Sequence, residues 1–246
     1  MERRIYIAGA RVSLAEYLPD ADDPANYENW QDPVMQAAYN FKMALSYDEF
    51  HARPARSRFL AAVVRNMDGK VIGNVSLSPE GSPPDLAIAL YRPYRFQGYG
   101  PEAYSLALSH CFSTFELTEI YAGCYPHNAA SMKMLKNCGF ERNPDGDCAE
   151  EHYLTGAPVV QMDHILCRSS YEKLRRARAF VSRVAELAGE MDLDYFVVTE
   201  GASGTSSRGC PAVDHARRSH VEWERAHGID PEHDWSEERE DKNQCV

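Results

Sequence analysis

Short apolar runs of strand length, separated by turn residues, dominate the N-terminal part of the chain. Such runs occupy residues 4–11, 58–64, 70–77 and 86–91, and runs of this length favour strands. The segment 66–69, Asn-Met-Asp-Gly, has the residue types of a tight turn between the second and third runs. The pattern therefore predicts a hairpin over residues 58–77 and a further strand shortly after it.

Helical signals are present at two places in the same part of the chain. Asp32 followed by Pro33 is a typical helix start, and the helix that it predicts runs to about Tyr39. After Pro101 and Glu102, small and apolar residues recur three or four positions apart, which predicts a second helix. We expect that helix to begin at Pro101, because proline suits the first helical position and a carboxylate complements the positive end.

A seven-residue apolar repeat marks the C-terminal part of the chain. It predicts a helix over residues 169–191, whose apolar positions are Leu174, Ala177, Val181, Val184, Ala188 and Met191. The repeat is short, so we expect this helix to dock on the body of the protein or on a second copy in a homodimer. A strand at 195–199, a loop at 200–211, a helix at 213–226 and a frayed, charged end at 236–246 are expected to follow.

Composition excludes several classes of function. The net charge of −11 argues against nonspecific nucleic-acid binding, which needs a basic surface. We expect no membrane association, because no apolar run is long enough to span a bilayer and the N-terminus lacks a signal-peptide core. The seven cysteines are scattered without a Cys-x-x-Cys pair, which indicates reduced thiols and a cytoplasmic protein. At 44% hydrophobic residues, the chain can bury a substantial core.

A glycine turn lies between the strand at 86–91 and the helix after it. The turn has the sequence Arg95-Phe96-Gln97-Gly98-Tyr99-Gly100. Glycine lets a backbone approach a ligand closely, and the first N–H groups of a helix attract phosphate, so the turn is a phosphate site or a plain tight turn. A P-loop would need Gly-Lys-Ser/Thr, and a dinucleotide-binding turn would need a third glycine where Ala103 stands.

The combined pattern resembles the GNAT superfamily of N-acetyltransferases. Arg95-x-x-Gly98-x-Gly100 is similar to the pyrophosphate loop of that family, and Asn128-Ala-Ala-Ser131 followed by Gly139-Phe140 is similar to its second half. The spacing resembles the RimJ/RimL-like branch, which acetylates N-termini of ribosomal proteins. The resemblance covers roughly residues 3–167. It implies a GNAT domain at 1–167 with an α/β fold, in which helices flank a mixed, mostly antiparallel sheet. The expected closing hairpin lies at 152–166. A small α/β extension is expected at 168–246.

The resemblance also implies the co-substrate acetyl-CoA and the residues that bind it. Backbone N–H groups of the turn would bind the pyrophosphate, an N–H near Leu90 would polarise the thioester, and Asn128 would contact the pantetheine arm or an ordered water. The implied cofactor-binding set is Leu90, Arg95, Phe96, Gln97, Gly98, Tyr99, Gly100, Pro101, Asn128 and Ser131.

Catalytic and acceptor residues are also expected from the resemblance. Many superfamily members have a tyrosine acid where this chain has Leu135, so Ser131 is the expected substitute, unless it only bonds its own helix backbone. Asp85 is the expected base, with Glu119, Tyr121, His127 or a water chain as alternatives. Trp30, Tyr39 and Phe41 are expected to line the acceptor pocket, or alternatively to pack early helices on the sheet.

These expectations give one function and two alternatives. The chain is expected to transfer acetyl from acetyl-CoA to a primary amine, which is a protein N-terminus or a small molecule. Alternatively, it is an inactive CoA-binding sensor or scaffold, or its extension carries the biology through a partner. No metal is expected, because the spacing of a histidine-rich segment does not match a zinc site; its residues are Cys210, His215, His220, His227 and His233.

Overall fold

The computed structural model describes residues 3–54 and 56–190. The chain divides into two compact units, Met1–Leu174 and Arg175–Val246, and each is considered by itself. The elements expected after residue 191 and the histidine-rich segment lie outside the described residues. The domain boundary expected at 167/168 therefore stays a prediction. Among the described helices, none combines the length and hydropathy needed to cross a membrane.

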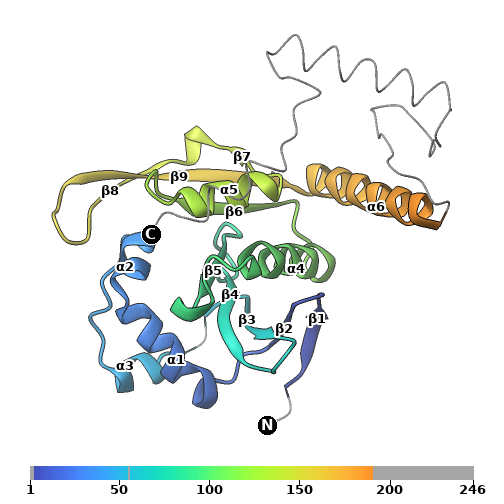
Figure 1. The fold of residues 1–246 in the computed structure, drawn as a ribbon. Helices are drawn as coiled ribbons and strands as arrows, with labels where there is room; N and C mark the ends of the chain where they lie inside the picture. Colours follow the sequence, from blue (N-terminus) through green and yellow to red (C-terminus); the bar gives the residue numbers. More distant parts are fainter. Residues whose placement is uncertain (1–2, 55, 191–246) are drawn as a thin grey trace, which may run out of the picture. The chain divides into compact units, whose positions relative to one another are not determined.

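A five-stranded antiparallel sheet forms the first half of the fold (Figure 1). Its strands pair in chain order: β1 (Ile5–Ala8), β2 (Val12–Glu16), β3 (Phe59–Arg65), β4 (Val71–Leu77) and β5 (Leu86–Leu90). The predicted hairpin is confirmed, with Phe59 opposite Leu77. The strand predicted over 4–11 is present as β1, and the chain turns at Gly9, where a turn or bulge was expected; β2, which follows the turn, was not predicted. That second strand is buried almost throughout, so no apolar and polar alternation marks it.

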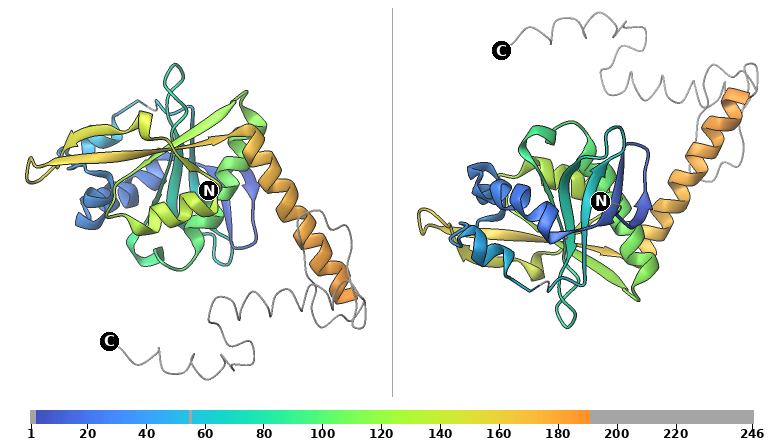
Figure 2. Two further views of the ribbon diagram at one scale, coloured as in Figure 1. Left: turned by 90° about the horizontal axis from the view of Figure 1, so that it is seen from above. Right: turned by 90° about the horizontal axis from the view of Figure 1, so that it is seen from below.

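A second sheet follows in the chain. Strand β6 (Glu119–Cys124) pairs with the long β9 (Pro158–Cys167), which also pairs with β7 (Glu141–Arg142) and β8 (Cys148–Glu151). The expected closing hairpin is therefore present as β8 and β9, with Gly156 at a φ of 66° in the connection, although its first strand begins at Cys148. Figure 2 shows this hairpin extending along the side of the molecule where the early helices lie.

Six helices and two short 3-10 turns surround the strands in the described part of the chain. They are α1 (Pro19–Gln31), α2 (Pro33–Tyr39), α3 (Tyr47–His51), η1 (Arg92–Tyr94), α4 (Tyr99–Thr114), α5 (Ala129–Asn137), η2 (Pro144–Gly146) and α6 (Arg168–Glu190). Asp32 caps α2 as predicted, since its side chain accepts a hydrogen bond from Val34 N at 3.0 Å. In the view of Figure 1, α1 to α3 lie to the left of the sheet and α4 to its right.

The apolar core lies between α4 and the strands. Val12, Leu14, Val63, Ile72 and Val75 of the sheet are fully buried there, together with Ala103 and Ala107 on the inner face of α4. At the end of α4, the Arg168 guanidinium donates to the carbonyls of Phe112, Phe115 and Leu117. These contacts attach the first turn of α6 to the core.

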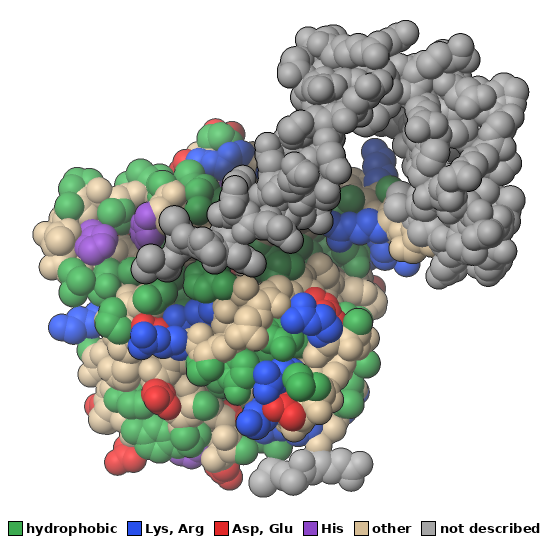
Figure 3. Space-filling model, in the orientation of Figure 1, with side chains coloured by type: hydrophobic (Ala, Val, Ile, Leu, Met, Phe, Trp, Pro, Cys, Tyr) green, Lys and Arg blue, Asp and Glu red, His purple; other side chains and the backbone are tan. Residues whose placement is uncertain are grey.

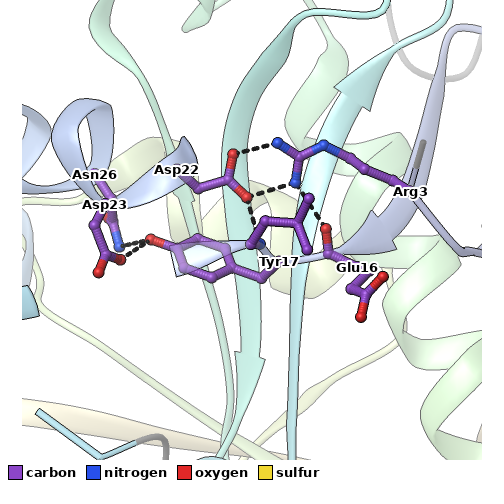
Figure 4. A network of polar contacts seen from close by, with 7 residues as sticks. Arg3, Glu16, Tyr17, Asp22, Asp23 and Asn26 are labelled. Carbon is purple, nitrogen blue, oxygen red and sulfur yellow. Dashed lines mark hydrogen bonds and ion pairs between the residues drawn. The ribbon is translucent and has the colours of Figure 1, made fainter. Parts of the chain in front are cut away.

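Helix α1 has a polar inner face. Its buried residues are Asp22, Asp23, Asn26 and Asn29. Figure 4 shows the partners of the first three: Arg3 donates to both oxygens of Asp22 at 2.6 Å, and Tyr17 Oη donates to Asp23 at 2.7 Å. Asn26 in turn donates to Tyr17 Oη and accepts from Asn74 of β4 at 3.0 Å. Hydrogen bonds therefore fix the position of α1, since each buried polar group needs a partner.

Candidate active site

A gap opens between the two sheets where β5 and β6 separate. The two strands meet at a single parallel bridge between Asp85 and Tyr121, where Tyr121 N donates to Pro84 O at 2.9 Å. Between the described residues of β5 and β6, no further pairing follows toward Leu90 and Cys124. Unpaired strand edges carry free N–H and C=O groups, so this gap can bind an extended ligand.

The register of β5 determines which of its peptide groups face the gap. Tyr91 N donates to Ile72 O and Ser78 N donates to Asp85 O, so the odd-numbered residues of β5 pair with β4. Because peptide groups alternate along an antiparallel strand, three even-numbered residues point the other way. These residues are Leu86, Ile88 and Leu90.

Side chains from three parts of the chain donate hydrogen bonds to the carbonyl groups on this edge. Tyr104 of α4 donates to Leu86 O at 2.9 Å, Tyr39 of α2 donates to Ile88 O, and Arg95 donates to Leu90 O at 2.8 Å. The acceptors on the edge are therefore satisfied, and the N–H groups of Ile88 and Leu90 face the gap. The expected position of a polarising N–H near Leu90 agrees with this geometry.

The glycine turn lies at the end of β5 and forms the start of α4. Phe96 and Gly98 have φ values of 60° and 80°, and Gly98 is the N-cap of the helix. The helix begins at Tyr99, two residues before the predicted start, because the glycine already supplies the left-handed turn. Pro101 lies in the first turn, where its missing N–H leaves no bond unmade. The first helical N–H groups are therefore available for an anion.

The structure corrects the role expected for the Arg95 side chain. Its guanidinium donates to Asp32 Oδ2 and to Asn29 Oδ1, both at 2.6 Å, in addition to Leu90 O. Burial alone would raise the pKa of Asp32, but hydrogen bonds from Val34 N and Arg95 hold this pKa below its usual value. Arg95 thus ties the turn to α1 and α2, and its charge is neutralised by Asp32.

Arg11 is a cation beside the turn that lies outside the sequence motif. Its Nη2 donates to Gln97 O at 2.8 Å, and its guanidinium lies 4.4 Å from the centre of the Tyr99 ring. Glu102 fixes this arrangement, since its Oε1 accepts from Arg11 N at 2.8 Å. The side chain is exposed and lies beside the first turn of α4. No local signal could reveal it, because Arg11 and Gln97 are 86 residues apart.

The acidic net charge is unevenly distributed over the surface. On the face seen in Figure 3, Lys and Arg side chains form separate blue patches among hydrophobic side chains. Arg11 is a cation at the turn. Arg65 of β3 also hydrogen-bonds to the Tyr99 hydroxyl and lowers its pKa more strongly than Arg11 does, but the Arg65 charge is paired with Asp68. Local positive charge therefore accompanies the helix start, which favours an anionic ligand.

Asp85 lies at the point where β5 and β6 separate. Burial raises the pKa of its carboxyl to about 6, against a hydrogen bond from the Gly123 N–H that lowers it, and nearby Asp163 adds to the rise. The alternative bases are differently placed: Glu119 accepts from Tyr121 Oη at 2.6 Å, and the exposed His127 lies 3.0 Å from Ala37 O. Asp85 is therefore the candidate that combines a place in the gap with a pKa close to neutrality.

The three aromatic residues expected to form a pocket wall come together. Trp30 contacts Tyr39 and Phe41 edge to face, with ring centres 5.1 and 5.8 Å apart. They line a cavity of about 310 Å³ together with Met43 and Arg53. Because the hydroxyl of Tyr39 donates to Ile88 O, the same side chain lines the pocket and borders the gap. Their role in binding an acceptor stays a prediction.

Comparison with known proteins identifies the family. A model of the acetyltransferase (GNAT) domain matches residues 11–141, which is more than half of the chain. The chain belongs to the GNAT acetyltransferase family.

Solved structures show the same GNAT fold. A spermidine N-acetyltransferase from Vibrio cholerae, in complex with CoA and spermine, is 18% identical, with a TM-score of 0.58 over 66% of this chain and 99% of that one. A GNAT acetyltransferase from Bacillus anthracis is 17% identical, with a TM-score of 0.55 over 65% and 97% of the two chains. None of the curated protein sequences compared with this chain matches it. The structures therefore support the fold, and the acceptor has to be inferred from this GNAT domain itself.

The GNAT motif residues of α5 have separate roles. Asn128 is the N-cap, and its Oδ1 accepts from Ser131 N at 3.1 Å. The cap therefore uses the Ser131 backbone, while the half-buried Ser131 hydroxyl makes no hydrogen bond to another described residue. Leu135, at the position of the family's tyrosine acid, is fully buried in the core. Of the side chains considered for the acid role in this GNAT domain, Ser131 alone is both polar and unengaged.

Tyr125 and Glu150 form a pair that sequence reasoning missed. Tyr125 follows β6, and its hydroxyl donates to Glu150 Oε2 at 2.7 Å, while Asn40 Nδ2 donates to the same oxygen at 3.0 Å. Burial is the main cause that raises the pKa of Tyr125 to about 12. The pair joins the end of β6 to β8, and Asn40 joins the end of α2 to the same strand, so the β8–β9 hairpin is attached next to the aromatic pocket.

Proposed function

We propose that the chain is an N-acetyltransferase that moves an acetyl group from acetyl-CoA to a primary amine within a ternary complex. The observation that carries this proposal is the convergence of two sites on one gap. The glycine turn lies at the end of β5, and the aromatic pocket borders the same strand through Tyr39 and Ile88. A gap with an anion site at one end and an apolar pocket beside it suits a reaction between two substrates.

The residues present fit the co-substrate. The N–H groups of residues 97–100 and the exposed Arg11 would hold its pyrophosphate, and the N–H of Leu90 and the side chain of Asn128 would line its pantetheine arm. The exposed Phe96 side chain, at 90% accessibility, lies within the same turn. Acetyl-CoA supplies an acetyl group activated as a thioester.

Three groups of this chain would then act on the reaction. Asp85, directly or through water, accepts the proton that the ammonium must lose before its nitrogen can attack. The Leu90 N–H hydrogen-bonds to the carbonyl oxygen as negative charge develops there. Ser131 donates a hydrogen bond to the leaving sulfur. A C–N bond forms and the C–S bond breaks; the second proton of the nitrogen passes to the leaving sulfur through the Ser131 hydroxyl, so that the products are the N-acetylated amine and the free thiol of CoA.

The finer assignments belong to the same proposal. Leu135 and Ser131 support a place in the RimJ/RimL-like branch, with a protein N-terminus or a small molecule as acceptor. The five described cysteines are free thiols, which supports a cytoplasmic protein. The absence of the tyrosine acid favours one alternative, an inactive CoA-binding sensor or scaffold whose extension mediates interactions.

Calorimetric titration of the purified protein tests the proposal. Acetyl-CoA is expected to bind at micromolar strength, while NAD and ATP serve as controls that share its adenine and phosphates. Amine-dependent release of CoA thiol then separates the enzyme from the inactive sensor. A folded protein that does not bind acetyl-CoA would refute both.

Arg11→Gln tests the cation beside the turn. The Kd for acetyl-CoA is expected to rise about tenfold, because one charge-assisted hydrogen bond to phosphate contributes on the order of 1.5–3 kcal/mol. Calorimetry measures the change, and Arg56→Gln, an exposed arginine away from the turn, is the matched control. If both variants bind as tightly as the unmodified protein, Arg11 has no part in cofactor binding.

Ser131→Ala tests the hydroxyl next to the gap. Turnover is expected to fall about tenfold to a hundredfold, because a lost proton donor slows departure of the thiolate, while the Kd for acetyl-CoA stays unchanged. The Asn128 cap uses the Ser131 backbone, so helix α5 should remain intact. Ser113→Ala, on the exposed end of α4, is the control. Unchanged turnover would mean that the Ser131 hydroxyl has no part in the reaction and that the residue only belongs to helix α5.

A further inference from the structure

The pocket beside Tyr39 has a chemistry that restricts the acceptor. Three aromatic rings form its walls, and Met43, only 7% exposed, closes its apolar side. Phe41 is 43% exposed, so the pocket opens to solvent next to this ring. Its volume of about 310 Å³ is at the lower end for sites that hold small organic molecules. A compact apolar group therefore fits, and a long extended chain does not.

Arg53 is the charged residue of this pocket. Its guanidinium lies 4.2 Å from the centre of the Phe50 ring, and its Nε donates to Phe50 O at 3.2 Å. Within residues 3–54 and 56–190, no carboxylate forms an ion pair with it. Both terminal nitrogens are thus available, in an orientation held by the Phe50 ring and carbonyl. A planar guanidinium of this kind binds carboxylates through two parallel hydrogen bonds.

The charge of Arg53 decides between two interpretations of the aromatic walls. Aromatic rings also attract cations, so the walls alone would admit a polyamine. No aspartate or glutamate lines the pocket among the described residues, and the guanidinium would repel a second cationic group. A polyamine is therefore disfavoured here, although a solved structure with the same fold contains spermine.

We propose that the acceptor is a small primary amine that carries an apolar body and a carboxylate, as an apolar amino acid does. Trp30, Tyr39 and Phe41 bind the apolar body, and Arg53 binds the carboxylate. This inference rests on the proposed acetyl transfer. The amine nitrogen is directed toward the gap at Ile88, which the Tyr39 hydroxyl connects to the pocket.

A panel of matched amines tests this acceptor class by thiol release. L-phenylalanine is paired with 2-phenylethylamine and 4-(aminomethyl)benzoate with benzylamine, so that each pair differs only in the carboxylate. Spermidine and a peptide amide with N-terminal phenylalanine complete the panel. At least one carboxylated amine is expected to have a kcat/KM about tenfold or more above its partner, as one bidentate ion pair allows. A preference for spermidine, for the partners without a carboxylate or for the peptide overturns the acceptor class and leaves acetyl transfer standing.

Arg53→Met completes the test. It should raise KM for the carboxylated amine about tenfold and leave the partner that lacks a carboxylate unaffected, whereas Arg53→Lys retains part of the preference and Arg56→Met changes neither. An equal effect of Arg53→Met on both amines overturns the assignment. Calorimetry on the same preparations keeps the two proposals apart. Acetyl-CoA binding without turnover of any amine in the panel refutes the acceptor class, while loss of acetyl-CoA binding in the unmodified protein refutes the proposed function itself.

Discussion

Gly98→Glu is expected to abolish acetyl-CoA binding, with a Kd at least about a hundredfold higher, while the protein stays folded. Gly98 has a φ of 80°, and a Cβ at this position would lie 3.1 Å from Nη1 of Arg11. A left-handed conformation costs a non-glycine residue roughly 1–2 kcal/mol, which a domain of this size tolerates. The added carboxylate would occupy the anion site and pair with its cation. Calorimetry and thermal unfolding measure the two effects.

Gly81→Glu is the matched control for this variant. Gly81 has a nearly equal φ of 83°, and no atom lies within 4 Å of the Cβ that a side chain would add. Both variants therefore carry the same backbone strain and the same new charge, in different places. Micromolar acetyl-CoA binding by Gly98→Glu, or an equal loss in Gly81→Glu, would contradict the assignment of the turn.

Asp85→Asn is expected to lower turnover about a hundredfold and to change its dependence on pH. In the unmodified protein, turnover should rise as the pH passes through about 6, because the carboxyl must be ionised to accept a proton. The amide of asparagine cannot accept a proton, so the rise in turnover near pH 6 should disappear in this variant. Asp145→Asn, on the exposed turn η2, is the control. Retained turnover with an unchanged profile would mean that Asp85 only joins the two strands.

The same substitution should stabilise the fold above pH 6. The pKa of Asp85 is raised in the folded state, so its contribution to stability is present below about pH 4 and is lost as the pH rises through about 6. A rise from 3.8 to about 6 corresponds to about 3 kcal/mol. Urea unfolding at pH 5 and pH 8 should show the unmodified protein losing stability relative to Asp85→Asn. A variant that gains stability while losing activity separates a catalytic role from a structural one.

Elements with local signals could be predicted from the sequence. The hairpin of β3 and β4 has two apolar runs of strand length around a glycine turn, and α2 begins at Asp32 followed by proline. The residue pattern marks neither strand β2 nor helix α1, for a physical reason. Strand β2 is buried on both faces, and the inner face of α1 carries Asp22, Asn26 and Asn29 where a periodic analysis expects apolar side chains. Their partners come from distant parts of the chain, so the pattern alone cannot show that they are buried.

The residues of the candidate site also fall into two groups, those marked by a local motif and those brought together by long-range contacts. The glycine turn and the Asn128 cap are short motifs, and they begin the helices that follow β5 and β6. The Arg11 side chain and the Tyr125–Glu150 pair depend on contacts between remote segments, which no spacing reveals. Arg95 was recognised as part of the motif, but the direction of its guanidinium follows from Asp32 and Asn29.

The hydrogen-bonded inner face of α1 gives the two halves of the site a common support. Its last members, Asn29 and the neighbouring Asp32, hold Arg95 and through it the turn after β5, while Trp30, between them in sequence, lines the aromatic pocket. Binding of acetyl-CoA at the turn would restrict the motion of the segment that forms the pocket. Binding of the amine would then cost less conformational entropy. An ordered kinetic mechanism, in which the nucleotide enters before the amine, is the natural consequence of this architecture.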